Sequence, residues 1–256
     1  MEFRIIALDM DGTLLDAAGQ IPDSFWPVLD ELRARDVAVA PASGRQLATL
    51  QAIFPGDTFI AENGTCVFHD GEIVSTTLLD DATVHAVIDV ALAADMDLVV
   101  CTPTVAYHRP GISAETEAEL QKYYHSLHAT EDLHAVTDVI KLAVFTTDIA
   151  EDTIYPVLLD AAPEANVVVS GAHWVDIMHA DAGKGRALTA LAEAMGVDKR
   201  QTAAFGDYLN DLELLEAAGT AWAMDNAHPD IKAIADHIAP PNTEAGVVTV
   251  LRALLD

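Results

Sequence analysis

The chain has 256 residues, of which 51% are hydrophobic, so it is long enough for one large domain or two modest ones with ordinary cores. Its 13 basic and 41 acidic residues give a formal charge of −28, and we therefore expect neither nucleic acid nor an anionic membrane surface as a partner. The acidic residues could serve only to solvate the surface, as in high salt or at low pH. A site for an anionic ligand in such a chain needs its own local positive charge.

The two cysteines, Cys66 and Cys101, are far apart and lack metal-type spacing. They predict a reduced protein with buried thiols rather than a disulfide. The N-terminal stretch carries charge and two carboxylates, so we expect no signal peptide. No apolar run approaches the length of a membrane span, and a cytoplasmic protein is expected.

Short apolar runs alternate with helical patterns from the N-terminus, which predicts a parallel sheet with crossover helices. Strands are expected over residues 3–8, 37–40 and 58–61, with a helix over 22–35. The dipeptide Asp70-Gly71 lies between two apolar pairs and predicts a β-hairpin.

From about Asp81 the order of elements changes. A helix followed by a hairpin occurs twice, which indicates an inserted α+β domain with an antiparallel sheet. Its expected helices cover residues 82–94, 115–124 and 151–160, and its expected strands cover residues 98–101, 140–145, 166–170 and 174–178, with a pairing segment near Tyr107-His108.

After Gly183 the alternation of strand and helix returns. The expected helices are 185–195, 208–218, 228–235 and 246–254, and the expected strands are 201–205, 220–223 and 237–238. The predicted fold is therefore α/β, with a doubly wound, Rossmann-like parallel sheet in a discontinuous core (residues 1–80 and 181–256). The α+β domain is expected over residues 81–180.

The first chemical motif is Asp9-Met10-Asp11-Gly12-Thr13-Leu14, which follows the first predicted strand. Two carboxylates two residues apart leave the sheet together, at the edge where open α/β sheets bind ligands. An ordinary turn after a strand also often contains Asp and Gly. Alone, the motif leaves that alternative open.

Two further motifs offer groups that bind anions. Ser43-Gly44-Arg45 supplies a hydroxyl and backbone N–H groups at the start of a helix, although such a serine by itself is commonly an N-cap. Lys184 lies between two glycines where a helix begins, so its ammonium group could approach a bound phosphate. A solvated surface lysine is the alternative.

A fourth motif follows the predicted strand 201–205. Asp207, Asn210 and Asp211 provide hard oxygen ligands of the kind that Mg²⁺ prefers. As helix-capping and first-turn acids they would instead stabilise the helix that follows. The four motifs together, each at a strand end of one sheet, indicate a phosphoryl-transfer site.

This set of motifs resembles that of the haloacid dehalogenase-like superfamily. The long insertion between Ser43 and Lys184 is similar to its Cof-type branch, in which an α+β cap domain occupies that place. The turn at residues 62–64 and the segment 242–247 resemble that branch as well. The resemblance implies a Mg²⁺-dependent phosphatase that acts on a small phosphorylated metabolite through an aspartyl-phosphate intermediate.

The resemblance also implies roles for individual residues. Asp9 would be the nucleophile, and Asp11 would be the general acid and then the general base. Mg²⁺ would be held by the carboxylates of Asp9 and Asp207 and by the backbone carbonyl of Asp11. The remaining residues would surround the phosphate or support the others: Gly12, Ser43, Lys184 and Asn210 in the first group, and Gly44, Arg45 and Asp211 in the second.

A closing cap would exclude water and select the substrate. Candidates for that selection are Tyr107, His108, Arg109 and Trp174. Three other functions fit parts of the pattern: a phosphomutase of the same fold, a phospho-accepting receiver module and a non-catalytic phosphate-binding regulator. The substrate stays open among sugar phosphates and phosphorylated vitamins such as pyridoxal phosphate or flavin mononucleotide, and so does the oligomeric state.

Overall fold

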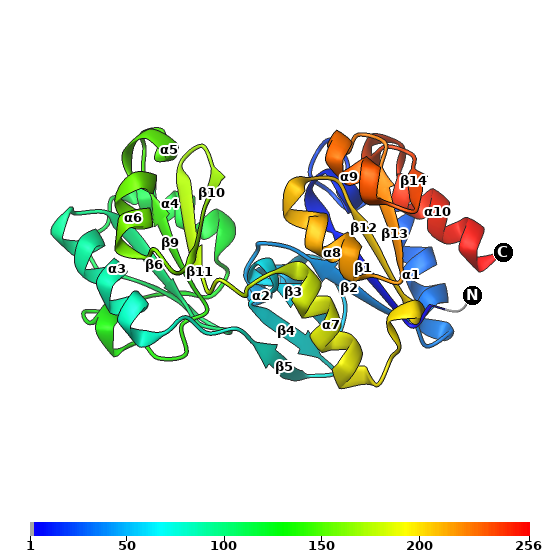
Figure 1. Cartoon of the computed structure of the whole chain (residues 1–256), viewed down its shortest axis with the longest axis horizontal. Helices are drawn as coiled ribbons and strands as arrows, with labels where there is room; N and C mark the ends of the chain where they lie inside the picture. Colours follow the sequence, from blue (N-terminus) through cyan, green and yellow to red (C-terminus); the bar gives the residue numbers. More distant parts are fainter. Residues whose placement is uncertain (1–2) are drawn as a thin grey trace. The chain divides into compact units, whose positions relative to one another are not determined.

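The computed structural model describes residues 3–256, so the first two residues of the expected core segment 1–80 lie outside the described residues. The chain forms two compact units (Figure 1). The first contains the chain up to Gly44, Phe54–Ser75 and Gly183–Asp256, and the second contains Arg45–Ile53 and Thr76–Ala182. Within the described range, no helix combines the length and the apolar character needed to cross a bilayer.

The first unit is built on a sheet of eight strands in the order β14-β13-β12-β1-β2-β3-β4-β5. The strands are β1 (Ile5–Asp9), β2 (Ala38–Ala42), β3 (Thr58–Ala61), β4 (Cys66–His69), β5 (Glu72–Thr76), β12 (Thr202–Gly206), β13 (Thr220–Met224) and β14 (His237–Ala239). All strands from β14 to β3 pair in parallel, and β4 pairs antiparallel with β3. Strands β1 and β12 are buried along their whole length, which explains their continuous apolar sequences.

The helices of this unit are α1 (Phe25–Ala34), α7 (Lys184–Met195), α8 (Leu212–Ala217), α9 (Pro229–Ile234) and α10 (Gly246–Leu255). The step from β1 to β2 through α1 and the step from β12 to β13 through α8 run in opposite directions along the sheet. Because such crossovers are right-handed, α1 and α8 cover opposite faces. The strand order reverses between β1 and β12, and the carboxyl ends of these two strands form the edge where open α/β sheets bind ligands.

The second unit has a six-stranded sheet in the order β10-β11-β9-β6-β7-β8. Its strands are β6 (Asp97–Cys101), β7 (Ala106–His108), β8 (Leu127–Ala129), β9 (Lys141–Phe145), β10 (Asn166–Gly171) and β11 (Trp174–Met178), and its helices are α2 (Leu47–Ile53), α3 (Asp81–Ala93), α4 (Ala114–Tyr123), α5 (Ala150–Thr153) and α6 (Tyr155–Ala161). All strand pairs are antiparallel except β7 with β8. Strand β9 is buried along its whole length, and its residues Leu142 and Val144 share one core with Val87 of α3 and Leu158 of α6.

Helix α2 precedes β3 in the sequence but is held by the second unit. The side-chain amide of Gln46 donates to the carbonyl of Ser126 at 2.9 Å, and its oxygen accepts from the N–H of Ser126 at 2.9 Å. The hydroxyl of Thr49 donates to the carbonyl of Tyr123 at 2.8 Å and accepts from the N–H of His125 at 3.2 Å. These four bonds explain why Arg45–Ile53 belongs with the inserted segment.

Several expected boundaries are wrong for identifiable reasons. Helix α1 starts at Phe25, whose N–H bonds to the carbonyl of Pro22, so the predicted first turn is a separate turn before the helix. The helix expected over 151–160 is two short helices, and Pro156 lies in the first turn of the second, where its missing N–H costs nothing. The helix expected from Tyr208 begins as a 3₁₀ turn.

The two cysteines lie in different units. Cys66 is in β4 and Cys101 is in β6, and both side chains are buried. Neither forms a disulfide with any described residue. Burial raises the pKa of the Cys66 thiol to about 12, so this thiol is a packing group at neutral pH.

Candidate active site

Asp9 and Lys184 form a buried ion pair at the carboxyl edge of the first unit's sheet. Asp9 is the last residue of β1, and Lys184 is the first residue of α7. The ammonium group of Lys184 donates to Oδ1 of Asp9 at 2.6 Å and to Oδ1 of Asp211 at 2.7 Å. Only 2% of Lys184 is exposed, so it supplies the local cation that an anion site in this acidic chain requires.

Asp211 uses both carboxylate oxygens within the protein. While Oδ1 binds Lys184, Oδ2 accepts from the backbone N–H groups of Asp207 at 3.1 Å and Tyr208 at 3.4 Å. This second set of bonds caps the 3₁₀ turn Leu209–Asp211. Asp211 therefore orients both Lys184 and the start of the Asp207 loop.

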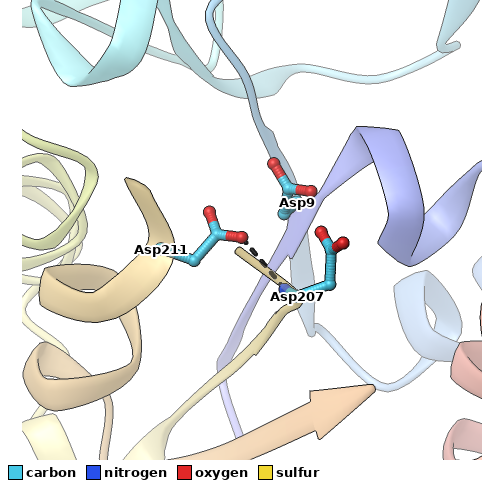
Figure 2. Close-up of side chains that lie close together, drawn as sticks. All are labelled: Asp9, Asp207 and Asp211. Atoms are coloured by element: carbon cyan, nitrogen blue, oxygen red, sulfur yellow. Dashed lines mark hydrogen bonds between the residues drawn. The ribbon is translucent and has the colours of Figure 1, made fainter. Parts of the chain in front are cut away.

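Three carboxylates converge at this point (Figure 2). One oxygen from each of Asp9, Asp207 and Asp211 lies within 4.8 Å of the others. Asp207 follows β12, and its Oδ1 accepts a hydrogen bond of 3.3 Å from the hydroxyl of Thr13. The switch point of the sheet thus brings together side chains about 200 residues apart in the sequence.

The electrostatics of the cluster favour an added cation. Burial raises the pKa of Asp9 to about 7 in spite of the opposing charge of Lys184, and the negative charge of Asp211 adds to the rise. Burial also raises the pKa of Asp207 to about 6, again with a contribution from Asp211. Burial alone would lower the pKa of Lys184, but the charges of Asp9 and Asp211 outweigh it and raise that pKa. One ammonium group does not neutralise three carboxylates.

The residues present fit a divalent metal ion with oxygen ligands. Lys184 binds Oδ1 of Asp9, so Oδ2 is the oxygen that can face a metal, together with the carboxylate of Asp207. Asp11 lies in the loop that follows β1, two residues after Asp9, and is exposed. Hard carboxylate and carbonyl oxygens suit Mg²⁺ better than softer transition metals.

Gly12 permits the close approach of the Asp9 loop to Asp207. Its φ is +81°, and a Cβ at this position would come within 2.2 Å of Oδ2 of Asp207. Any side chain would therefore both strain the backbone and displace the Asp207 carboxylate.

One turn contacts both proposed phosphate-binding segments. The turn Glu62–Gly64 follows β3 and has positive φ at all three residues. The N–H of Asn63 donates to the carbonyl of Ser43 at 2.9 Å. A Cβ on Gly64 would come within 2.3 Å of the carbonyl oxygen of Gly183, immediately before Lys184. The turn thus braces the end of β2 and the start of α7.

The other expected site residues have distinct positions. Ser43 is buried just after β2, and a Cβ on Gly44 would come within 3.0 Å of the side chain of Asn63. Asn210 is exposed in the 3₁₀ turn, one residue before Asp211. Arg45 falls in the second unit, at the start of the segment that contains α2.

Three contributors to the site were not predicted from the sequence. The hydroxyl of Thr13 bonds to Asp207, and its place within the first motif could have suggested this. The backbone carbonyl oxygen of Glu213 packs against Gly185, and a Cβ on Gly185 would come within 2.2 Å of it. This close contact explains the second glycine beside Lys184. Asn226 follows β13 at the same sheet edge and donates to the carbonyl of Gly12 at 2.8 Å. The position of Asn226 at the end of a strand could have suggested that it contributes to the site.

Comparisons with known proteins identify the family to which the chain belongs. The family model of the haloacid dehalogenase-like hydrolases matches residues 6–251. The chain is 27% identical over 263 residues to the 5-amino-6-(5-phospho-D-ribitylamino)uracil phosphatase YbjI of Escherichia coli, covering 100% of this chain and 97% of that protein. It is 28% identical over 280 residues to the phosphatase YwtE of Bacillus subtilis, which is named for the same substrate, covering 98% of each chain.

A crystal structure of a protein from Eubacterium rectale superposes with a TM-score of 0.88 at 28% identity, covering 99% of this chain and 100% of that chain. The chain belongs to the haloacid dehalogenase-like hydrolase family. Its matched relatives include named phosphatases, and the predicted fold class and enzyme class are confirmed.

Proposed function

We propose that this protein is a Mg²⁺-dependent phosphatase that hydrolyses small phosphomonoesters through an aspartyl phosphate on Asp9. The observation that carries the proposal is the buried cluster in which Lys184 bridges Asp9 and Asp211 beside Asp207. A carboxylate that attacks a phosphate dianion must overcome charge repulsion. The cluster provides an ammonium group and a set of oxygen ligands that meet this need.

Asp9, Asp207 and the backbone carbonyl of Asp11 would hold Mg²⁺. The ion, when bound, neutralises charge on the transferring phosphoryl group and on the carboxylates that surround it. Lys184 remains protonated because Asp9 and Asp211 raise its pKa, and it supplies a fixed positive charge on the other side of Asp9. Asp211 orients Lys184, and both of its oxygens already accept hydrogen bonds within the protein.

In the first step a carboxylate oxygen of Asp9 attacks phosphorus, the bond from phosphorus to the ester oxygen breaks, and the carboxyl group of Asp11 gives its proton to the leaving alkoxide. In the second step a water oxygen attacks phosphorus, and Asp11 takes the proton of that water. The acyl-phosphate bond then breaks, which restores Asp9 and releases inorganic phosphate. Asp11 is exposed, so it can exchange protons with a leaving group and with water.

The phosphoryl oxygens would be bound by the side chains of Ser43 and Lys184 and by backbone N–H groups that follow Asp11 at Gly12, with Asn210 at the rim. Support for this comes from the Glu62–Gly64 turn, which braces the segments of both Ser43 and Lys184. Residues 81–180 would act as the cap that excludes water during the first step. The substrate class is supported by relatives that act on phosphorylated small molecules, such as YbjI on 5-amino-6-(5-phospho-D-ribitylamino)uracil.

The proposal is tested by phosphate release from a panel of sugar phosphates, pyridoxal phosphate, flavin mononucleotide and ribitylaminouracil phosphates. Turnover should require Mg²⁺, stop on chelation and be lost in Asp9→Asn. The exposed variant Asp23→Asn serves as the matched control, because it removes one carboxylate elsewhere in the same unit. Undiminished turnover in Asp9→Asn, or turnover in chelator, would contradict the mechanism.

A further inference from the structure

Two asparagines outside the four sequence motifs hold the loop that carries Asp11. Asn226, just after β13, donates from Nδ2 to the carbonyl oxygen of Gly12 at 2.8 Å. Asn242, at the start of the 3₁₀ turn Asn242–Glu244, donates from Nδ2 to the carbonyl oxygen of Leu15 at 2.8 Å. The backbone N–H of Asn242 donates to Oδ1 of Asn226 at 3.0 Å. We call these two residues the asparagine clamp.

The clamp has one workable arrangement of its amide groups. Asn226 donates with its nitrogen and accepts with its oxygen. Rotating the Asn226 side-chain amide by 180° would place two acceptors together, Oδ1 and the Gly12 carbonyl oxygen. It would also place two donors together, Nδ2 and the N–H of Asn242. An aspartate has the same shape but no donor, so it would place a carboxylate oxygen against that carbonyl.

The loop that the clamp holds contains a turn of defined type. Asp11 has φ −78° and ψ 119°, and Gly12 has φ 81° and ψ −5°. These are the angles of the central residues of a type II turn. A flip of the peptide between Asp11 and Gly12 would give a type I turn, reverse the direction of the Asp11 carbonyl and require a negative φ at Gly12.

We infer that Asn226, supported by Asn242, is a positioning residue that holds the Gly12 loop in place and with it the Asp11 carbonyl oxygen. Its hydrogen bond holds the peptide immediately after Gly12, and Asn242 holds the end of the same loop at Leu15. A flip of the Asp11–Gly12 peptide alone would leave the Gly12 carbonyl in place, so the bond to that carbonyl opposes displacement of the loop as a whole, which would move the Asp11 carbonyl oxygen with it. The consequence for the rate rests on the proposed function, in which this carbonyl is a Mg²⁺ ligand.

The exposure of the clamp separates positioning from general stability. Asn226 is exposed and Asn242 is half-buried, so loss of either bond should leave global unfolding almost unchanged. The effect should concentrate in residues 10–15. A merely structural role would instead lower the stability of the whole unit.

The test compares wild type with Asn226→Asp, Asn226→Ala, Asn242→Ala and the double alanine variant. Asn166→Asp, a half-buried position in β10 of the second unit, is the control for added charge. In metal-free protein, amide hydrogen exchange of residues 10–15 should be faster in both Asn226 variants at an unchanged urea midpoint. For Asn226→Asp, kcat should fall about tenfold or more and the Mg²⁺ concentration for half-maximal rate should rise by a similar factor, with the substrate KM nearly constant.

Asn226→Ala should lose less than Asn226→Asp, because no oxygen then opposes the Gly12 carbonyl. The double alanine variant should be no worse than the more damaging single variant, since the two asparagines act as one unit. The inference would be overturned if the amides of residues 10–15 exchanged at the wild-type rate in both Asn226 variants. It would also be overturned if their exchange were faster only in proportion to a loss of global stability. If wild type itself releases no phosphate, the proposed function fails, and the hydrogen-exchange comparison alone still decides whether the clamp fixes the loop.

Discussion

Gly12 lies so close to Asp207 that a Cβ on the glycine would come within 2.2 Å of Oδ2 of the aspartate. The contact joins the loop after β1 to the loop after β12, at the point where the strand order of the first unit reverses. The spacing of the two proposed metal-binding carboxylates, Asp9 and Asp207, therefore depends on the absence of a side chain at Gly12.

Gly12→Ala tests this dependence. The new Cβ must displace the Asp207 carboxylate, and a shift of about 1 Å at a reacting centre can cost about 100-fold in rate. Phosphate release should fall by about that factor, with a higher Mg²⁺ requirement. Gly19→Ala is the matched control, because Gly19 also has a positive φ of +71° but nothing within 4 Å of a Cβ. Equal losses in the two variants would show that backbone strain, and not the contact with Asp207, is responsible.

Lys184→Met should remove both activity and stability. It leaves Asp9 and Asp211 buried without their cation, and breaking a buried ion pair typically costs about 3–5 kcal/mol. The loss in unfolding free energy should be smaller at pH 5 than at pH 8, because the carboxyl group of Asp9, whose pKa burial raises to about 7, holds a proton at the lower pH. Lys122→Met, at an exposed ion pair with Glu119, should change little. If Lys184→Met had the same free energy of unfolding in urea as the wild type, the electrostatic description of the site would be contradicted.

The stability of metal-free protein should fall as the pH rises from about 4 to about 7. Burial raises the pKa of Asp9 from 3.8 to about 7, so in this window the folded protein holds a proton that the unfolded chain has lost. Stabilisation from this group is complete below the ordinary pKa and is lost as the pH passes the raised one. Urea unfolding in chelator should therefore show a shallower pH dependence for Asp9→Asn than for wild type or Asp23→Asn.

Magnesium should reverse this trend, because it requires deprotonated ligands. The rise in unfolding free energy on adding Mg²⁺ should be larger at pH 8 than at pH 5. Identical pH slopes in wild type and Asp9→Asn would count against the raised pKa, and a Mg²⁺ effect that is independent of pH would count against carboxylate ligands.

Gln46→Glu should loosen helix α2 from the second unit. Gln46 is 1% exposed and both donates to and accepts from the backbone of Ser126, so a carboxylate oxygen would face the Ser126 carbonyl. The expected cost is about 1–3 kcal/mol, with faster amide exchange along α2. Gln51→Glu adds the same charge to an exposed position of the same helix and should have little effect. If Gln51→Glu were equally damaging, added charge would be the cause.

The positions of the core strands along the chain and of the acidic motifs followed from the sequence, because buried parallel strands have continuous apolar sequences and ligand-binding loops follow them. Asp9, Asp207 and Asp211 were singled out in this way and Lys184 as a cation between two glycines at a helix start, and the structure places these four residues together. The supporting role expected for Asp211 came from the resemblance to the family, and the residue pattern alone did not distinguish it from the other carboxylates. Only the geometry shows that Asp211 has both oxygens engaged and that Thr13 binds Asp207.

The membership of α2 could not be predicted, because it depends on contacts between Gln46 or Thr49 and backbone groups more than 70 residues away. The asparagine clamp escaped notice for a related reason. Asn226 and Asn242 lie in turns, where asparagine is common for local reasons, and their bonds to the Gly12 loop span more than 200 residues.

The most direct test of the central claim is to trap the acyl phosphate. Wild-type protein would be mixed with Mg²⁺ and its best substrate, quenched during turnover and reduced with borohydride, which converts an aspartyl phosphate to homoserine. Mass spectrometry of the peptide that contains residues 5–15 should then show homoserine at Asp9, absent in chelator and in Asp9→Asn. Homoserine at another aspartate, or none during demonstrated turnover, would contradict the assignment of Asp9 as the nucleophile.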